Sequence, residues 1–245
     1  MIGNRYNWLA LFRALFVIVN PLRFFAAIAR GQALPDVVVR TPTGHFRVFL
    51  RNYESLKTCF SVFCRRDYAT SIDPPCEFLD VGANIGIASL YFLSRNPANR
   101  VTCFEPDRAN LGFLERNLSE FDKRSKINAY ALGLSPGLVS LFRADDGKYS
   151  SLIPSERACL PDQVECRVFD DALRETATNA LPVVVKLDVE GLELDLVRSI
   201  EWRNHPGIWR LLCESTECAE VISREHIRRI HNGYVEDVIF KDTGS

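Results

Sequence analysis

Two acidic residues of this sequence each stand at the end of a short apolar run. Asp80 is followed by a turn that contains Gly82 and Gly86, and Glu105 follows the run at 101–104. In open α/β sheets, ligands collect where a strand ends and the next helix begins. A carboxylate at the first position attracts a cationic or ammonium group, directly or through water, and one at the second accepts both hydrogen bonds of a ribose diol. The pair predicts a site for a positively charged nucleoside cofactor.

The glycine spacing distinguishes this turn from a dinucleotide site. Dinucleotide sites use G-x-G-x-x-G, so that backbone amides cradle a pyrophosphate. Here the glycines follow G-x-x-x-G and residue 84 is Asn, which disfavours nicotinamide cofactors. Glu105 has a second interpretation as a cap for the helix that begins near Asp107. The occurrence of both acidic motifs together favours ribose binding.

A third group of acids lies further along the chain. Asp188 and Glu190 end a predicted strand and are two residues apart, so an extended backbone places them on the same side. Either one is a candidate to accept the proton of an acceptor hydroxyl, or to clamp that hydroxyl directly or through Mg²⁺. In the alternative interpretation Asp188 caps the following helix and Glu190 is structural. Glu214, after the next apolar run, is the third candidate, and Lys186 is assigned no role.

Short apolar runs alternate with longer helical runs from residue 78 onwards. Fully apolar strands between amphipathic helices predict an α/β fold with a doubly wound, mostly parallel sheet that is covered on both faces. Further strands are expected at 139–143 and 164–169. The expected strands of the sheet are 78–82, 101–105, 127–132, 183–188 and 208–213, and the helices are 86–95, 108–121 and 192–201.

The part of the chain before this alternation is expected to form an extension. Runs rich in β-formers at 37–40 and 46–51 flank a turn sequence and predict a hairpin, and 56–68 is expected to be helical. The predicted divisions are a helical segment at 1–35, a hairpin and helix at 36–75 and the main domain at 76–245.

The first 35 residues hold arginines and no acidic residue. A helix is expected at 7–19, ended by Pro21, with a second at 22–29. Arginines and Pro21 interrupt the apolar run, which disfavours a membrane-spanning helix or a signal peptide. The expected apolar stripe consists of Leu11, Leu15, Ile18 and Leu22. Two interpretations remain open: the stripe packs on the main domain or on a second subunit, which is favoured, or residues 1–30 lie on an anionic membrane surface.

Composition excludes several classes of partner and site. Thirty basic against thirty-one acidic residues give a formal charge of −1 over 245 residues, so no overall field attracts a nucleic acid. The eight cysteines show no common zinc spacing and are expected to be reduced. The chain is therefore expected to be cytoplasmic, and no metal ligands are predicted, although the paired acids would suit a divalent ion.

Three segments together resemble the FkbM family of S-adenosylmethionine-dependent methyltransferases. They are residues 78–86, 101–106 and 185–193, and the similarity extends over 78–214. The resemblance implies a Rossmann-like class I fold, S-adenosylmethionine as cofactor, and methylation of a hydroxyl on a sugar, a lipid-linked glycan or a natural product. The cofactor-binding residues that it implies are Asp80, Gly82, Ala83, Asn84 and Gly86 around the methionine part, Glu105 and Pro106 at the ribose, Leu132 near the adenine, and Ser151 in a loop near the cofactor.

The acceptor is the least determined part of this hypothesis. A hydroxyl-bearing saccharide or natural product is favoured. A small metabolite or a protein as acceptor, and a non-catalytic binding protein that retains the fold, are the alternatives, and the chain is compatible with a homo-oligomer.

Overall fold

The computed structural model describes residues 5–69, 75–144, 158–176, 181–189, 191–213, 218–221, 227–230 and 235–239. Within these residues, seven strands form a sheet in the order β11-β12-β10-β9-β3-β4-β5. Strands β10, β9, β3, β4 and β5 run parallel, whereas β12 is antiparallel to β10 and β11 is antiparallel to β12. The predicted α/β fold with a mostly parallel sheet is confirmed. The strands are β3 (Glu77–Val81), β4 (Arg100–Phe104), β5 (Ser125–Asn128), β9 (Val183–Leu187), β10 (Ile208–Cys213), β11 (Ile227–Ile230) and β12 (Val235–Ile239).

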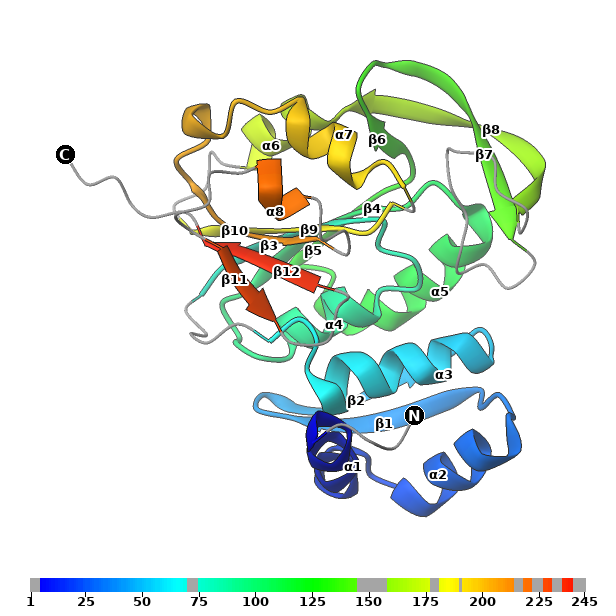
Figure 1. Ribbon diagram of the computed structural model, residues 1–245. Helices are drawn as coiled ribbons and strands as arrows, with labels where there is room; N and C mark the ends of the chain where they lie inside the picture. The colour runs from blue at the N-terminus through cyan, green and yellow to red at the C-terminus, as the bar shows by residue number, and fades with distance from the viewer. Residues whose placement is uncertain are drawn as a thin grey trace.

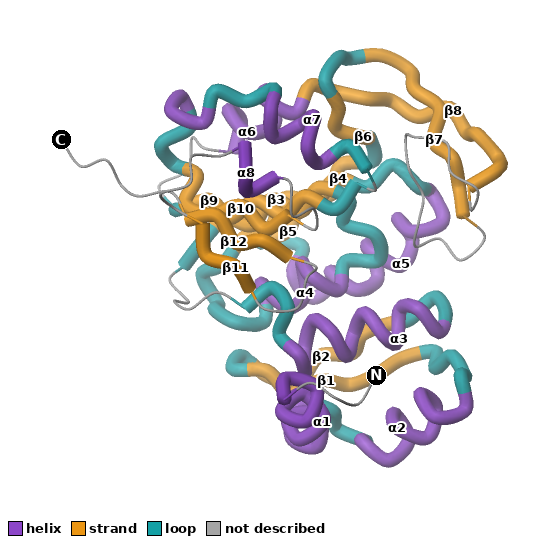
Figure 2. Tube along the Cα trace, in the orientation of Figure 1, coloured by secondary structure: helices purple, strands orange, loops and turns teal. Residues whose placement is uncertain are grey.

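Helices cover both faces of this sheet (Figures 1 and 2). One face carries α4 (Ile87–Leu93) and α5 (Arg108–Leu118), which continues into η2 (Ser119–Phe121), and the other carries α6 (Phe169–Thr176), α7 (Glu193–Arg198) and α8 (Cys218–Val221). Strand residues alternate between the two apolar clusters: Phe78 packs in one, and its neighbour Leu79 packs in the other. Every residue of β3 and β9 is buried, as expected for their apolar positions, and the charged Glu77, Asp80 and Lys186 are buried with them.

The expected strand 127–132 is wrong in one respect, because it divides between two sheets. Residues up to Asn128 pair with β4, whereas β6 (Ala131–Gly133) pairs in parallel with β8 (Ala158–Val168). Together with β7 (Gly137–Ala144) these strands form a three-stranded sheet in the order β6-β8-β7. The Tyr130 ring lies between the two sheets, 5.5 Å from the Phe104 ring and 4.0 Å from the Arg167 guanidinium. Apolar content predicts a strand but does not select its partner.

The extension contains the expected hairpin and helices. Its elements are α1 (Arg5–Val17), α2 (Pro21–Arg30), β1 (Asp36–Thr41), β2 (Gly44–Phe49), α3 (Tyr53–Cys59) and the π-helix η1 (Phe60–Arg65). The helix expected at 56–68 begins earlier because the side chain of Asn52 accepts a hydrogen bond from the Ser55 amide at 2.9 Å. It ends earlier because Arg66 adopts a left-handed conformation, with φ 65°.

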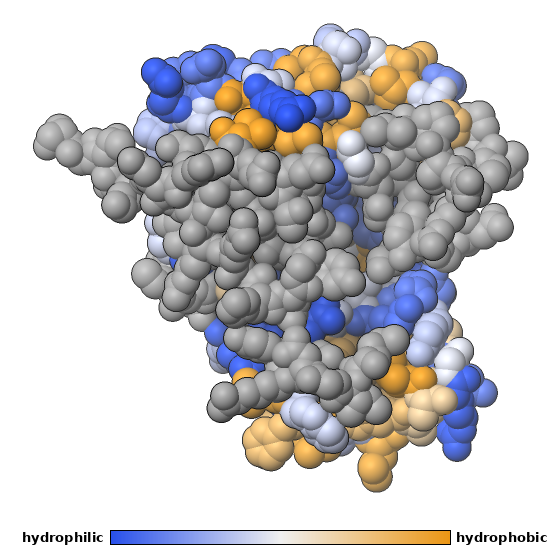
Figure 3. All heavy atoms as spheres, in the orientation of Figure 1, coloured by the Kyte–Doolittle hydropathy of each residue, from blue (hydrophilic) through white to orange (hydrophobic). Residues whose placement is uncertain are grey.

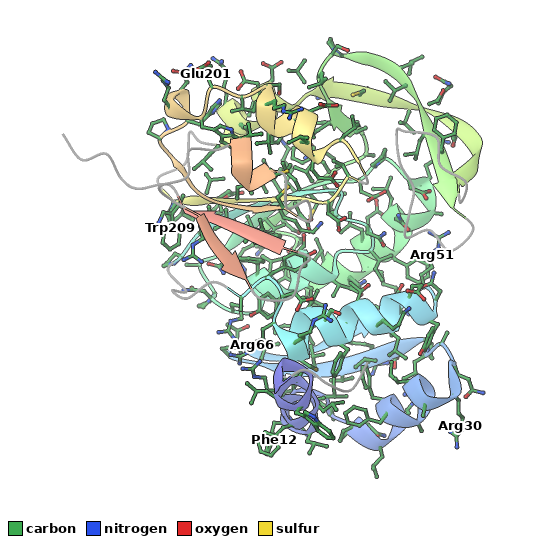
Figure 4. All side chains as sticks on the ribbon, viewed as in Figure 1. Phe12, Arg30, Arg51, Arg66, Glu201 and Trp209 are labelled. Carbon is green, nitrogen blue, oxygen red and sulfur yellow. The ribbon has the colours of Figure 1, made fainter. Side chains whose placement is uncertain are left out.

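Polar contacts attach the extension to the main sheet. The Asn117 side chain on α5 accepts a hydrogen bond from the Phe49 amide at 2.7 Å and donates to the Ile85 carbonyl at 2.7 Å. Arg51, which faces α5 in Figure 4, donates to the Asn110 side chain at 2.7 Å. One apolar cluster includes residues from Ala14 to Leu212. The division at 75/76 stays a prediction, although a single core crosses it.

Of the apolar stripe expected on the first two helices, one member packs on the described structure and three do not. Whether the stripe packs on a second subunit or lies on a membrane surface stays a prediction. Ile18 is buried, whereas Leu11, Leu15 and Leu22 are exposed within the described structure. Helix α1 instead contacts η1, and it buries a narrow row of small residues in which Ala10 and Ala14 allow close approach. No described helix has the length and hydropathy that crossing a bilayer requires.

Candidate functional site

The site lies where the order of the strands reverses. From β3 the chain proceeds outward through β4 and β5, and it then returns to the other side of β3 with β9 and β10. Asp80 is aligned with Lys186, and Val81 with Leu187, in the parallel pair β3–β9. The carboxyl ends of these strands are therefore adjacent at the switch point, which is the usual ligand position in an open α/β sheet.

The turn after β3 is held tightly to both neighbouring strands. The amides of Gly82 and Ala83 both donate to the Phe104 carbonyl at 3.0 Å. Gly82 has φ +78°, and a Cβ there would lie 1.9 Å from the Asp188 carbonyl oxygen. Only glycine permits this approach of two backbones.

The rest of the G-x-x-x-G turn also uses left-handed backbone. Asn84 has φ 51°, and its side chain accepts a hydrogen bond from the Ile85 amide at 2.8 Å, which is typical of asparagine in this conformation. Gly86 has φ +80°, and a Cβ there would lie 2.5 Å from Leu114 Cδ1 on α5. The residues that distinguish this turn from a dinucleotide site are therefore explained by the left-handed backbone and the close packing of the turn.

Glu105 connects this turn to the end of β4. Its Oε2 accepts a hydrogen bond from the Asn84 amide at 2.7 Å, and its Oε1 accepts from the Asp107 amide at 2.9 Å and the Asn110 side chain at 3.3 Å. Burial raises the pKa of Glu105 to about 7, against the lowering effect of these donors. Asp107, not Glu105, caps α5 by accepting from the Ala109 amide at 2.9 Å.

A buried lysine for which the sequence predicts no role lies at the centre of the site. Lys186 Nζ is 3.0 Å from Asp80 Oδ1, 3.0 Å from the Gly82 carbonyl oxygen and 3.3 Å from Asp188 Oδ2. Asp80 also accepts from Ser89 Oγ at 2.6 Å. A lysine within the apolar run of β9 is a usable signal, because buried ammonium groups require partners.

The two carboxylates beside Lys186 differ in accessibility. The Asp80 side chain is 0% exposed, whereas the Asp188 side chain is 27% exposed. Of these two carboxylates, therefore, only Asp188 can contact a molecule that binds at this edge of the sheet.

Glu193 orders the segment after Asp188, a role that sequence reasoning missed. Its Oε1 accepts from the Val189 amide at 3.0 Å and its Oε2 accepts from the Gly191 amide at 2.9 Å. Glu193 is in the first turn of α7, where a carboxylate that reaches back to preceding amides is a common capping arrangement. Val189 and Gly191, which follow Asp188, are thus held in place from α7.

The other predicted site residues are distributed as follows. Ala83 is buried beside the turn and Pro106 is partly buried after Glu105. Leu132 on β6 packs in the same apolar cluster as Phe104, near the end of β4. Ser151, Glu190 and Glu214 lie outside the described residues. Among the described residues, no group of three or more His, Cys, Asp or Glu side chains is placed to hold a metal ion.

Two methyltransferases and one solved structure are similar to this chain. The chain is 31% identical over 172 residues to methyltransferase sdnD of Sordaria araneosa, and the match covers 64% of each protein, so the chain spans less than two thirds of that relative. It is 24% identical to methyltransferase 1 of Beauveria bassiana, over 71% of this chain and 80% of that protein. A crystal structure of a methyltransferase from Geobacter sulfurreducens is 12% identical with a TM-score of 0.40, over 69% of this chain and 73% of that chain.

The family model described as the methyltransferase FkbM domain matches residues 80–225. This range begins at Asp80 and includes Glu105, Lys186 and Asp188, so the matched region contains the whole described site. Because the match covers more than half of the sequence, the resemblance noted from three short segments is confirmed, and the chain belongs to the family of methyltransferase FkbM domains.

Proposed function

We propose that this chain transfers the methyl group of S-adenosylmethionine to a hydroxyl of a saccharide, glycan or other natural-product acceptor. Family membership supports the methyl transfer. The observation that carries the cofactor assignment is the buried Glu105 carboxylate, held at the end of β4 beside the Gly82 turn. A carboxylate in this place in the fold is suited to a ribose diol.

The donors around Glu105 leave it capacity for such a ligand. A carboxylate has about four lone-pair directions, and Oε2 accepts one hydrogen bond, from the Asn84 amide. The remaining direction on Oε2 is available to a ribose hydroxyl. The described residues therefore fit the nucleoside part of S-adenosylmethionine.

Asp80 acts in this proposal as a positioning residue. Its complete burial leaves no surface for a direct contact with the cofactor ammonium group, and its carboxylate instead fixes Lys186. Lys186 in turn holds the Gly82 carbonyl and the Asp188 carboxylate. Asp80 thus orders the turn and the acceptor side of the site through one ammonium group.

Asp188 is the described candidate for binding the acceptor hydroxyl. When bound, S-adenosylmethionine supplies a methyl group that its sulfonium sulfur has already activated. The chain must then hold the hydroxyl oxygen in line with that methyl group and remove the hydroxyl proton. Asp188 is exposed enough to accept this proton, and Glu190 and Glu214 remain candidates for the same task from outside the described residues.

Replacing Glu105 with glutamine tests the cofactor site. The affinity for S-adenosylmethionine is expected to fall about 10- to 100-fold, because a charged acceptor is lost. In the wild type, affinity should rise with pH through about 7, since the diol binds the ionised form of Glu105. Isothermal titration calorimetry across this range measures both effects. Glu115→Gln, on the exposed side of α5, is the control, and equal affinity and pH dependence in Glu105→Gln and wild type would contradict the assignment.

The same carboxyl group predicts a pH dependence of stability without cofactor. Burial raises its folded-state pKa from the ordinary value of 4.5 to about 7. The contribution of Glu105 to the free energy of unfolding is therefore fully present below pH 4.5 and is lost as the pH rises through about 7. Urea denaturation of wild type and Glu105→Gln across this window is expected to show the smaller decline in the variant. Parallel curves for the two proteins would refute the burial effect.

Replacing Asp188 with asparagine tests the acceptor side. Turnover is expected to fall about 10²- to 10⁴-fold, because asparagine does not accept the proton, while cofactor affinity stays within about twofold of wild type. Lys186 keeps its ion pair with Asp80 in this variant, so the protein should still fold. Transfer of a tritiated methyl group to fractionated glycans and natural products supplies the readout. Asp195→Asn, exposed on α7, is the control. Full turnover in Asp188→Asn would assign the base to another residue.

The chemistry of the labelled product decides the acceptor class. Methylation of an alcohol gives an ether that resists mild base, whereas a methylated carboxyl group gives an ester that base hydrolyses. A base-stable label in the glycan or natural-product fractions supports the proposal. Label confined to protein or to base-labile material would support an alternative acceptor.

A further inference from the structure

Helix α1 is apolar on two opposite faces, and the described residues cover only one of them. Ala10, Ala14 and Ile18 are 0–1% exposed and belong to the side that contacts η1 and β1. Phe12 is 58% exposed and Phe16 is 61% exposed on the other side. A helix that is apolar all round is expected to have its second face covered as well.

Most of the exposed large apolar residues lie at this end of the molecule. Among the residues that the structure describes, eight of the eleven exposed large apolar side chains lie between positions 8 and 22. They follow helical spacing along α1 and continue to the start of α2. We call this group the α1–α2 apolar face: Trp8, Leu9, Leu11, Phe12, Leu15, Phe16, Val19 and Leu22. Apolar surface gathers around the extension in Figure 3, and Figure 4 shows Phe12 pointing outward there.

Positive charge surrounds the same end. Arg23 and Arg47 share one carboxylate, Asp36, at 3.7 and 3.1 Å. Arg40 donates to the carbonyls of Phe16 and Ile18 at 3.0 and 3.1 Å, which places a guanidinium at the end of α1. Arg30 is exposed at the end of α2 and is labelled at this end in Figure 4. Among the described residues at this end, four arginines, Arg23, Arg30, Arg40 and Arg47, therefore accompany one carboxylate, Asp36.

We propose that the α1–α2 apolar face docks on the surface of an anionic phospholipid bilayer. Aromatic and aliphatic side chains would enter the region between headgroups and acyl chains, and the arginines around them would contact lipid phosphates. Helix α1 has 13 residues, and at 1.5 Å per residue its length of about 20 Å is less than the hydrocarbon thickness. The helix therefore lies along the surface and does not cross it.

The positive charge around the α1–α2 apolar face favours an anionic bilayer over a second copy of the chain as its partner. A two-fold dimer pairs a surface patch with itself, so the arginines of both copies would be brought together with one Asp36 from each. An anionic bilayer instead neutralises them and accepts the apolar side chains. The inference concerns α1 and α2 alone and does not depend on methyl transfer.

Sedimentation with lipid vesicles tests the proposal on the full chain. Binding is expected to vesicles that contain about 30% phosphatidylserine, and to be several-fold weaker on pure phosphatidylcholine or when the salt is raised from about 0.1 to about 0.5 M. Phe16→Asp should lower the partition coefficient about tenfold or more. Leu138→Asp removes a leucine that is 75% exposed on β7, and it should bind as wild type does. Circular dichroism should show both variants folded, since Phe16 and Leu138 are exposed.

The other outcomes overturn the proposal. Wild-type protein that stays in solution with both kinds of vesicle would exclude lipid as the occupant. Equal vesicle binding by Phe16→Asp would place the contact elsewhere. A dimer in sedimentation velocity that Phe16→Asp dissociates, without vesicle binding by the wild type, would identify this face as an interface between copies.

Discussion

Gly82→Ala is expected to lower the free energy of unfolding by about 2–5 kcal/mol, through left-handed strain and overpacking together. The added Cβ would lie 1.9 Å from the Asp188 carbonyl oxygen, and the obstacle is backbone that no side-chain rotation relieves. The Asp188 amide is itself bonded to the Val81 carbonyl at 3.1 Å, so β9 resists moving away. Urea denaturation followed by circular dichroism measures the loss.

Gly112→Ala is the matched control for this prediction. Gly112 lies in α5 with nothing within 4 Å of its added Cβ, so alanine should increase the free energy of unfolding by about 0.5–1 kcal/mol. Opposite signs for the two substitutions are the expected result. A Gly82→Ala protein as stable as wild type would show that the β3 and β9 ends are further apart than the structure places them.

Lys186→Met is expected to destabilise the protein by about 3–5 kcal/mol, because the buried Asp80 carboxylate loses its cation. Ser89 Oγ would still donate its hydrogen bond to Asp80 at 2.6 Å, but it carries no charge. The double variant Asp80→Asn/Lys186→Met removes both charges and should recover part of the loss. A double-mutant cycle from denaturation curves gives the interaction energy of the pair.

An exposed lysine serves as the control for the buried one. Lys57 pairs with Glu54 on α3 while its side chain is 48% exposed, so Lys57→Met should change the free energy of unfolding by no more than about 0.5 kcal/mol. If Lys186→Met were equally mild, or if the double variant recovered nothing, the Asp80–Lys186 pair would not organise the site. Loss of methyl transfer in a folded Lys186→Arg variant would indicate that the position of the ammonium group also matters.

Local sequence is sufficient to predict most helices and strands, and it accounts for the residue types in the turn after β3. Strands such as β9 and helices such as α2 are near their expected positions, because apolar periodicity, Pro21 and Gly31 act over a few residues. The left-handed positions at Gly82, Asn84 and Gly86 follow from residue type for the same reason. Helix α3 begins three residues before the expected position 56, because the Asn52 side chain caps it there.

The alternation of strands and helices, the family, and the two acids Asp80 and Glu105 at the site can all be predicted from local sequence. How these two acids are used depends on contacts between distant parts of the chain. Lys186 and Asp80 are 106 positions apart and meet through strand pairing, which burial and hydrogen bonding across the sheet select and no local pattern encodes. The same is true of the division between β5 and β6, and of which face of α1 is buried. Local propensities set each element, whereas the partner of each element depends on the packing of the whole chain.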